Sequence, residues 1–352
     1  MIIEGPALSI TGEMASENRD RITGRDDTWN CQQHDESACG ATANTGADQC
    51  VWSSALTACV GNTWSYYTGK GIELNTVDDV TVTGCTVKYT TNSGIRCDKC
   101  DNTTIDSNIV YGTNWWTHSA TSAVVFAEAL GSGTNAITNN IVYANRNFLP
   151  FFLTGSLAHF GSGVEHYGQW NQSVVVDGNG VYITRNLDYE GTFNLNDNVA
   201  YDNGINGLVV HKTTHENVTV NVLRNKIFDN GKTEKEVEGR QDAGGLTINT
   251  GDAAGEVLLQ DNQVTASALP DRTYQCFGTC TLLAGSSGNT VCGGDYNTKL
   301  DSAAFATGTD CDQQAADFAA LRALYPDAQM PLSAQYTPFL EPDLTPVMGA
   351  DD

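Results

Sequence analysis

Four residues in the middle of the chain suit proton transfer beside an anion: Tyr182, Arg185, His211 and Lys212. Such groups serve β-elimination or epimerisation at a uronic acid. There, a cation acidifies the α-proton, a base takes it and an acid protonates the leaving oxygen. We assign Arg185 to neutralisation of the carboxylate, Lys212 or His211 to the base and Tyr182 to the acid. The hypothesis requires that folding bring these residues together.

A repeated motif supplies the fold that would do so. A small residue followed by apolar-x-apolar begins at Gly71, Gly94, Ala123, Gly180, Gly207 and Gly245. Most copies are followed by two further strand-like segments, separated by Gly, Asn and Asp turns. One such unit cannot bury its apolar face alone, but stacked units share a continuous core, so the pattern predicts a solenoid of three-strand coils.

The third segment of most units opens with asparagine, at Asn108, Asn140, Asn198, Asn225, Asn262 and Asn289, and Cys85 takes that place in an early unit. We expect these side chains to stack inward as a ladder. Their amides would bond backbone groups at a turn that no sheet partner satisfies.

Aligning the first strands at their opening small residue turns sequence positions into surface columns. Glu73, Arg96, Val125, Tyr182, Val209 and Thr247 would face outward, and the strand ends would carry Thr76, Lys99, Glu128, Arg185, Lys212 and Thr250. Because coils lie about 4.8 Å apart, Arg185 and Lys212 would be neighbours, and either Glu128 or an anionic sugar would offset their repulsion. Arg96, Lys99 and Glu128 are therefore candidate substrate contacts. The alternative is a solvated ladder of ion pairs.

Insertions in two units add aromatic candidates. The 29 residues from Gly94 to Ala123 include Trp115 and Trp116, and the 57 from Ala123 to Gly180 include Arg146, His166, Tyr167 and Trp170. Aromatic faces beside a sheet suit sugar binding. For the apolar run Phe148, Phe151 and Phe152, we favour a small satellite core that holds the long loop down.

Within residues 69–291, the patterns Gly-Ile-x-Leu, x-Val-Thr-Ile and Asn-x-Val-x-x-Asn-Gly resemble the right-handed parallel β-helix superfamily, which includes pectate lyase-like proteins. The fullest match is 207–231. The resemblance implies an all-β, single-stranded right-handed parallel β-helix. It also implies polysaccharide lyases, glycoside hydrolases, uronan epimerases, tailspikes, adhesins or ice-binding proteins as relatives. The Asp-Pro-His-Asp motif of alginate epimerases is absent.

We predict one domain over 1–352. Residues 1–65 would form an N-terminal coil and a Cys-rich loop, 66–294 the coils with an inserted loop at 129–179, and 295–352 a cap helix and extended tail. The helix is expected from Asp312, a plausible N-cap, to Tyr325, with Phe318, Leu321 and Leu324 at apolar helical spacing.

Eleven cysteines favour an oxidising compartment. Cys31 with Cys39, Cys50 with Cys59, Cys276 with Cys280 and Cys292 with Cys311 could each close a short loop, although sequence cannot fix the connectivity. For Cys97 and Cys100, a core cysteine or a local disulfide is favoured over a zinc site. Sequons at Asn102, Asn171 and Asn217 agree with secretion. We therefore expect an extracellular protein, although no signal peptide is visible.

The chain carries 42 acidic and 18 basic residues, a net charge of −24. This balance argues against nucleic acid, whose phosphates need clustered cations, and no stretch is apolar enough to insert into a membrane. We expect a monomer that requires no cofactor, although Asp-rich turns could bind Ca²⁺.

The sequence therefore predicts a secreted carbohydrate-active protein whose partner is a polysaccharide, with lyase chemistry on an acidic one favoured. The alternative is a non-catalytic glycan-binding, adhesive or wall-associated surface protein. An inverting glycoside hydrolase, for which Asp188 and Glu190 would be candidates, and an ice-binding protein rank lower.

Overall fold

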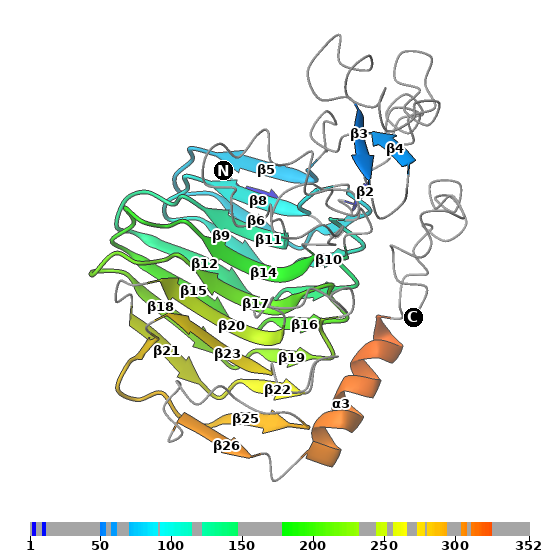
Figure 1. Ribbon diagram of the computed structural model, residues 1–352. Helices are drawn as coiled ribbons and strands as arrows, with labels where there is room; N and C mark the ends of the chain where they lie inside the picture. The colour runs from blue at the N-terminus through cyan, green and yellow to red at the C-terminus, as the bar shows by residue number, and fades with distance from the viewer. Residues whose placement is uncertain are drawn as a thin grey trace.

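The computed structural model describes residues 2–4, 9–11, 50–53, 58–61, 70–90, 92–114, 122–146, 178–231, 244–251, 256–265, 273–278, 280–293, 304–307 and 311–325. Figure 1 shows successive coils stacked into a column, with one helix along its side. Three sheets of parallel strands form the walls, and each coil in the middle of the column contributes one strand to each sheet. The predicted parallel β-helix is confirmed. Among the residues that the structure describes, no helix is long and apolar enough to cross a membrane.

Sheet 1 contains the six predicted first strands and one more. In chain order its seven strands are β5 (Ile72–Asn75), β8 (Ile95–Asp98), β11 (Ser122–Ala127), β14 (Asn179–Thr184), β17 (Asn206–His211), β20 (Gly244–Gly251) and β23 (Tyr274–Gly278).

Sheet 2 contains eight strands and begins with an N-terminal one. They are β1 (Ile2–Glu4), β6 (Thr81–Thr83), β9 (Thr104–Asp106), β12 (Thr134–Thr138), β15 (Thr192–Asn196), β18 (Thr219–Leu223), β21 (Glu256–Gln260) and β24 (Thr281–Leu282).

Sheet 3 contains nine strands. They are β2 (Ser9–Thr11), β7 (Thr86–Lys88), β10 (Ile109–Tyr111), β13 (Ile141–Tyr143), β16 (Val199–Tyr201), β19 (Lys226–Phe228), β22 (Gln263–Thr265), β25 (Asn289–Cys292) and β26 (Phe305–Thr307). Apart from the sheets, β3 (Cys50–Ser53) and β4 (Ala58–Gly61) form an antiparallel hairpin.

The core follows from strand alternation. In sheet 1, Ile72, Ile95, Val124, Val181, Leu208 and Leu246 share one register position and all lie in the buried core. Leu74, Cys97, Phe126, Ile183, Val210 and Ile248 form the second inward column, as predicted. Residues two apart point to the same face of a strand, so each apolar-x-apolar motif supplies one layer of core.

Each corner of the coil contains a residue with a left-handed backbone. At corner 1, between sheets 1 and 2, these are Thr76, Lys99, Glu128, Arg185 and Lys212, with φ between 45° and 56°. At corner 2, between sheets 2 and 3, they are Ser107, Asn139, Asp197, Arg224 and Asp261. At corner 3, between sheet 3 and sheet 1 of the next coil, they are Tyr89, Ala144, Asp202 and Asp229. This conformation costs an L-residue about 1 kcal/mol. Its recurrence at one position shows that a sharp bend is required there.

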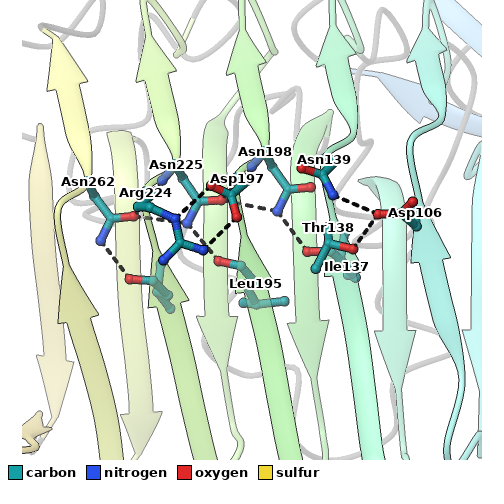
Figure 2. A network of polar contacts seen from close by, with 11 residues as sticks. Asp106, Ile137, Thr138, Asn139, Leu195, Asp197, Asn198, Arg224, Asn225 and Asn262 are labelled. Atoms are coloured by element: carbon teal, nitrogen blue, oxygen red, sulfur yellow. Dashed lines mark hydrogen bonds and ion pairs between the residues drawn. The ribbon is translucent and has the colours of Figure 1, made fainter.

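The predicted asparagine ladder runs along corner 2, immediately after these bends. Asn198 Nδ2 donates to the Ile137 carbonyl at 2.8 Å and to Asn225 Oδ1 at 3.1 Å, while its backbone N–H donates to the same Oδ1 at 2.9 Å (Figure 2). Asn225 repeats this arrangement with Leu195 and Asn262. At the start of the ladder, the Cys85 backbone N–H donates to Asn108 Oδ1 at 2.9 Å. The ladder therefore satisfies backbone groups that the bend removes from the sheets.

A second ladder at corner 3 was not predicted. Backbone N–H groups of Thr113, Asn145 and Asn203 donate to the Oδ1 atoms of Asn145, Asn203 and Asn230, respectively, at 3.0–3.3 Å. These four residues follow corner 2 ladder positions by five residues each. Both ladders are buried. Two lines of hydrogen bonds thus fix the height of each coil on the next.

The predicted C-terminal helix, α3 (Cys311–Leu324), packs against the outer side of sheet 3 (Figure 1). Phe318 stacks on Phe228 at the end of a column of rings that continues through Tyr201, Tyr143 and Tyr111. Burial alone would lower the pKa of Arg322, but its hydrogen bonds to Asp202 and Asp229 outweigh this effect and raise it. Two details differ from expectation: Asp312 lies inside the first turn, and Leu324 is exposed because it faces away from the sheet.

Three disulfides are present in the described residues. Cys276–Cys280 and Cys292–Cys311 confirm two predicted pairings, and the latter ties α3 to β25. Cys97 pairs with Cys100, which confirms a local disulfide rather than a zinc site. Burial raises the pKa of the Cys85 thiol. Cys31 and Cys39, and the side chains of Cys50 and Cys59, lie outside the described residues.

The ladder account is tested by Asn225→Ala. The variant leaves the Asn198 N–H and the Leu195 carbonyl buried without their partner, so we expect a loss of about 2–4 kcal/mol in the free energy of unfolding, measured by urea denaturation. Asn221→Ala is the control, because the Asn221 side chain is outside the core and, among the residues that the structure describes, bonds only Asn194. Its cost should be below about 1 kcal/mol. Equal losses in the two variants would contradict a structural role for the ladder.

Candidate functional site

The register of sheet 1 brings Tyr182 and His211 together from positions 29 residues apart. Thr184 on β14 pairs with His211 on β17, and Tyr182 is two residues before Thr184 on the same face. The Tyr182 hydroxyl lies 2.8 Å from His211 Nδ1, and the two rings are nearly parallel at a centroid distance of 5.8 Å. The predicted proximity of the proposed acid and one proposed base is therefore present.

Thr184 completes this contact and was not a sequence candidate. Its hydroxyl lies 2.9 Å from the same nitrogen, His211 Nδ1. A neutral imidazole can accept a hydrogen bond at Nδ1 from a hydroxyl, whereas a protonated imidazole donates one from Nδ1–H to a hydroxyl oxygen. The two hydroxyls therefore hold the ring in one orientation in either charge state. The sequence signal was the period-two alternation that puts Thr184 on the outer face with Tyr182.

The outer face of sheet 1 is less open than predicted. Val125, Tyr182, Val209 and Thr247 occupy the expected outward column, but their exposed fractions are only 0, 7, 5 and 1%. Val125, Ala127, Tyr182 and Val209 form a small apolar cluster of their own. The centre of this face is therefore buried, which is the environment that its apolar side chains favour. His211 is half-buried and is the more accessible member of the Tyr182–His211 pair.

The predicted charges lie beside this pair, at corner 1. The Arg185 backbone N–H donates to the His211 carbonyl at 3.2 Å, and the Arg185 guanidinium lies 3.8 Å from the Glu128 carboxylate. Both side chains are well exposed, at 65% and 48%, so this ion pair is weak. Lys212 is exposed, and its ammonium pairs with no acidic side chain in the described ranges. Beside the Tyr182–His211 pair, corner 1 therefore presents the cations Arg185 and Lys212, with the Glu128 carboxylate partly compensating Arg185.

The remaining sequence candidates separate into three groups. Lys99 is exposed at corner 1, and Arg96 on β8 forms a 2.7 Å ion pair with Asp98 of the same strand. Arg146 is at corner 3, where its Nε donates to the Asp202 carbonyl. The length of a sheet 1 strand, roughly 20 Å for six residues, separates corner 3 from corner 1, so Arg146 does not join the cluster. Trp115, Trp116, His166, Tyr167 and Trp170 lie outside the described residues.

Corner 1 also contains a histidine–carboxylate pair that sequence analysis missed. His215 Nε2 lies 3.6 Å from Glu190 Oε1, and His215 Nδ1 accepts a hydrogen bond from the Asn217 backbone N–H at 3.2 Å. The two residues are on successive coils, after Lys212 and Arg185, respectively. No local motif distinguishes them, because their contact depends on how the two corner loops stack.

Two of the turn aspartates, Asp106 and Asp197, bond neighbouring side chains. Partial burial alone would raise the pKa of Asp106, but hydrogen bonds from Thr138, Asn139 and Ser107 outweigh it and hold the pKa below its usual value. Figure 2 shows the bonds from Thr138 and Asn139. Asp197 forms a two-pronged ion pair with Arg224 (Figure 2). Across the described ranges, no group of three or more His, Cys, Asp or Glu side chains could hold a metal ion.

Comparison with known proteins agrees with this architecture. The family model "Right handed beta helix region" matches residues 30–293, more than half of the chain. The chain belongs to the right-handed β-helix family. No curated protein matches it. Among solved structures, the β-helix is similar to the crystal structure of pectate lyase Pel9A, with 12% identity and a TM-score of 0.32. The match covers 61% of this chain and 51% of that one, about half of its length.

The hydrogen bond between Tyr182 and His211 can be tested by NMR of ¹⁵N-labelled histidine. Tyr182→Phe removes the hydroxyl but keeps the ring, so the Nδ1 resonance of His211, assigned with His211→Gln, should shift, and stability should fall by about 1 kcal/mol. Arg224→Gly, at corner 2, should leave the resonance in place. An unchanged Nδ1 resonance in both Tyr182→Phe and Thr184→Val would contradict the geometry.

Proposed function

We propose that this β-helix is a carbohydrate-active protein that binds an acidic polysaccharide at corner 1 and cleaves it by β-elimination at a uronic acid. The supporting observation is the 2.8 Å contact between the Tyr182 hydroxyl and His211 Nδ1, beside the cations Arg185 and Lys212. The three disulfides agree with an extracellular setting, where such polymers occur.

In this proposal the corner 1 cations act on the substrate carboxylate. Arg185, with Lys212, neutralises it and so acidifies the proton on the adjacent carbon. His211 takes that proton, and the electron pair of the broken carbon–hydrogen bond forms the new carbon–carbon double bond as the bond to the glycosidic oxygen breaks. Tyr182 gives its proton to the leaving oxygen and recovers one from His211 across their hydrogen bond. Two chain ends result, one of them unsaturated.

The overall charge of −24 opposes this binding. Beyond a Debye length of about 8 Å at physiological salt, however, the repulsion from the rest of the surface is screened, whereas charges in direct contact are not. Binding of a polyuronate should therefore depend on the local pair Arg185 and Lys212. Glu128 competes for Arg185, so its carboxylate weakens the attraction.

Elimination is tested by incubation with alginate, pectate, glucuronan and chondroitin. A lyase produces an unsaturated sugar whose ultraviolet absorbance rises with time. Tyr182→Phe and His211→Gln should each lower kcat by about 100-fold or more. Arg185→Gly and Lys212→Gly remove the charge in a residue type that accepts positive φ, and each should raise KM or lower kcat.

Arg224→Gly is the matched control, because it removes a cation with the same backbone conformation from corner 2. The rate at which this variant forms the unsaturated product should be unchanged. The proposal would be overturned by equal losses in Arg224→Gly and Arg185→Gly, or by an unsaturated product that persists in His211→Gln.

The second candidate is non-catalytic glycan binding. The burial of Tyr182, which is 7% exposed, favours it, since a catalytic acid must reach its substrate. Under this alternative, no substrate of a broad panel is cleaved. A glycan array would instead show binding that Arg185→Gly weakens and Glu128→Gln strengthens, because removal of Glu128 frees the guanidinium for a sugar carboxylate.

A further inference from the structure

Two of the three sequons occupy equivalent places in the fold. Asn102 and Asn217 both lie in corner 1 loops, and in each case the threonine two residues later begins a strand of sheet 2, Thr104 in β9 and Thr219 in β18. The third sequon, at Asn171, lies outside the described residues. The same Asn-x-Thr motif therefore lies at corner 1 on two different coils, and the surroundings of Asn102 and Asn217 can be compared directly.

The Asn102 side chain is part of the corner. Its Nδ2 donates to Asp78 Oδ1 on the preceding coil, and its Oδ1 accepts the Thr134 backbone N–H from the following coil, both at 3.1 Å. Its backbone has φ of 42° and donates to Asp101 Oδ1. The carboxamide thus joins three coils. A sugar on Nδ2 would displace or crowd the contact with Asp78.

Asn217 differs on each count. It is exposed, it does not have a positive φ, and its backbone N–H donates to His215 Nδ1. Its carboxamide makes no hydrogen bond with any residue that the structure describes. The side chain of Val218, between them, is buried in the core, and Thr219 begins β18 with its side chain facing outward. A group attached to Asn217 Nδ2 would therefore project into solvent without breaking a contact.

We propose that Asn217 is an N-glycan acceptor of this chain and that Asn102 is not. The Asn217 amide nitrogen would attack the anomeric carbon of a lipid-linked oligosaccharide diphosphate. The carbon–nitrogen bond forms, the anomeric carbon–oxygen bond breaks, the lipid diphosphate leaves with the electron pair, and the amide loses one proton to a base. The sugar is added before folding. A chain that carries it on Asn217 can still form the corner, whereas a chain that carries it on Asn102 cannot, so folded molecules carry the glycan on Asn217.

The acceptor assignment is tested by secreting the full chain from a eukaryotic host that N-glycosylates, with an Asn-x-Thr acceptor tag appended as an internal control. Peptide mass mapping of the folded, disulfide-bonded product should show a glycan on Asn217 and none on Asn102. Asn217→Gln and Thr219→Val should each remove one glycan, whereas Thr219→Ser, which preserves the sequon, should retain it.

Two results would overturn the proposal. One is an unmodified Asn217 in molecules whose tag is occupied. The other is a glycan on Asn102 in product whose thermal unfolding and disulfides match those of unmodified chain made without glycosylation. Because the readout is the modification itself, it is independent of any activity toward polysaccharides.

Discussion

The structure depends on one constraint: each coil must bend at the same three places as its neighbours. Parallel strands bond only to the coils on either side, so a bend that moved by one residue would turn the inward side chains of the next strand outward. At each corner, a residue such as Arg224 takes the left-handed conformation, and at corners 2 and 3 an inward polar residue such as Asn225 follows it. The asparagine replaces the backbone hydrogen bonds that the bend removes, and so it fixes both the position of the bend and the height of the coil.

This constraint explains where the surface chemistry lies. Once the bends are aligned, side chains at strand ends form columns, and Arg185 and Lys212 lie in one column because each occupies the bend of its own coil. Chain inserted between strands leaves the register intact: 57 residues separate Ala123 from Gly180, yet β11 and β14 pair without a shift. The outer faces are then available for different uses. Sheet 3 binds α3 through its ring column, while the covered face of sheet 1 holds Tyr182 against His211.

Much of this architecture could be predicted because it repeats. The apolar-x-apolar motif gave the inward columns of sheet 1, and the recurring asparagine before each third strand gave the corner 2 ladder. The second asparagine of the repeat was visible, but its role was not, since a side chain that bonds a backbone amide on another coil leaves no local signal.

The burial of Val209 and Tyr182 could not be predicted either, because alternation indicates which face a residue is on but not whether that face is buried. The contact of Thr184 with His211 and the pair His215 with Glu190 depend on side-chain packing between coils. The positions of the corner 1 charges, and the approach of Glu128 to Arg185, were therefore predictable, whereas these other side-chain contacts were not.

The register of the coils is tested most directly by cysteine cross-linking on the outer face of sheet 2, where Asn194 pairs with Asn221 and Asn196 pairs with Leu223. Paired positions lie about 4.8 Å apart, within the range for a disulfide, whereas the diagonal from Asn196 to Asn221 is about 8 Å, beyond it. Under mild oxidation, the double variant Asn194→Cys with Asn221→Cys should form a disulfide in nearly all molecules, and Asn196→Cys with Asn221→Cys should not. Preferential cross-linking of the diagonal pair would place the coils out of register and contradict the proximity of Tyr182 and His211.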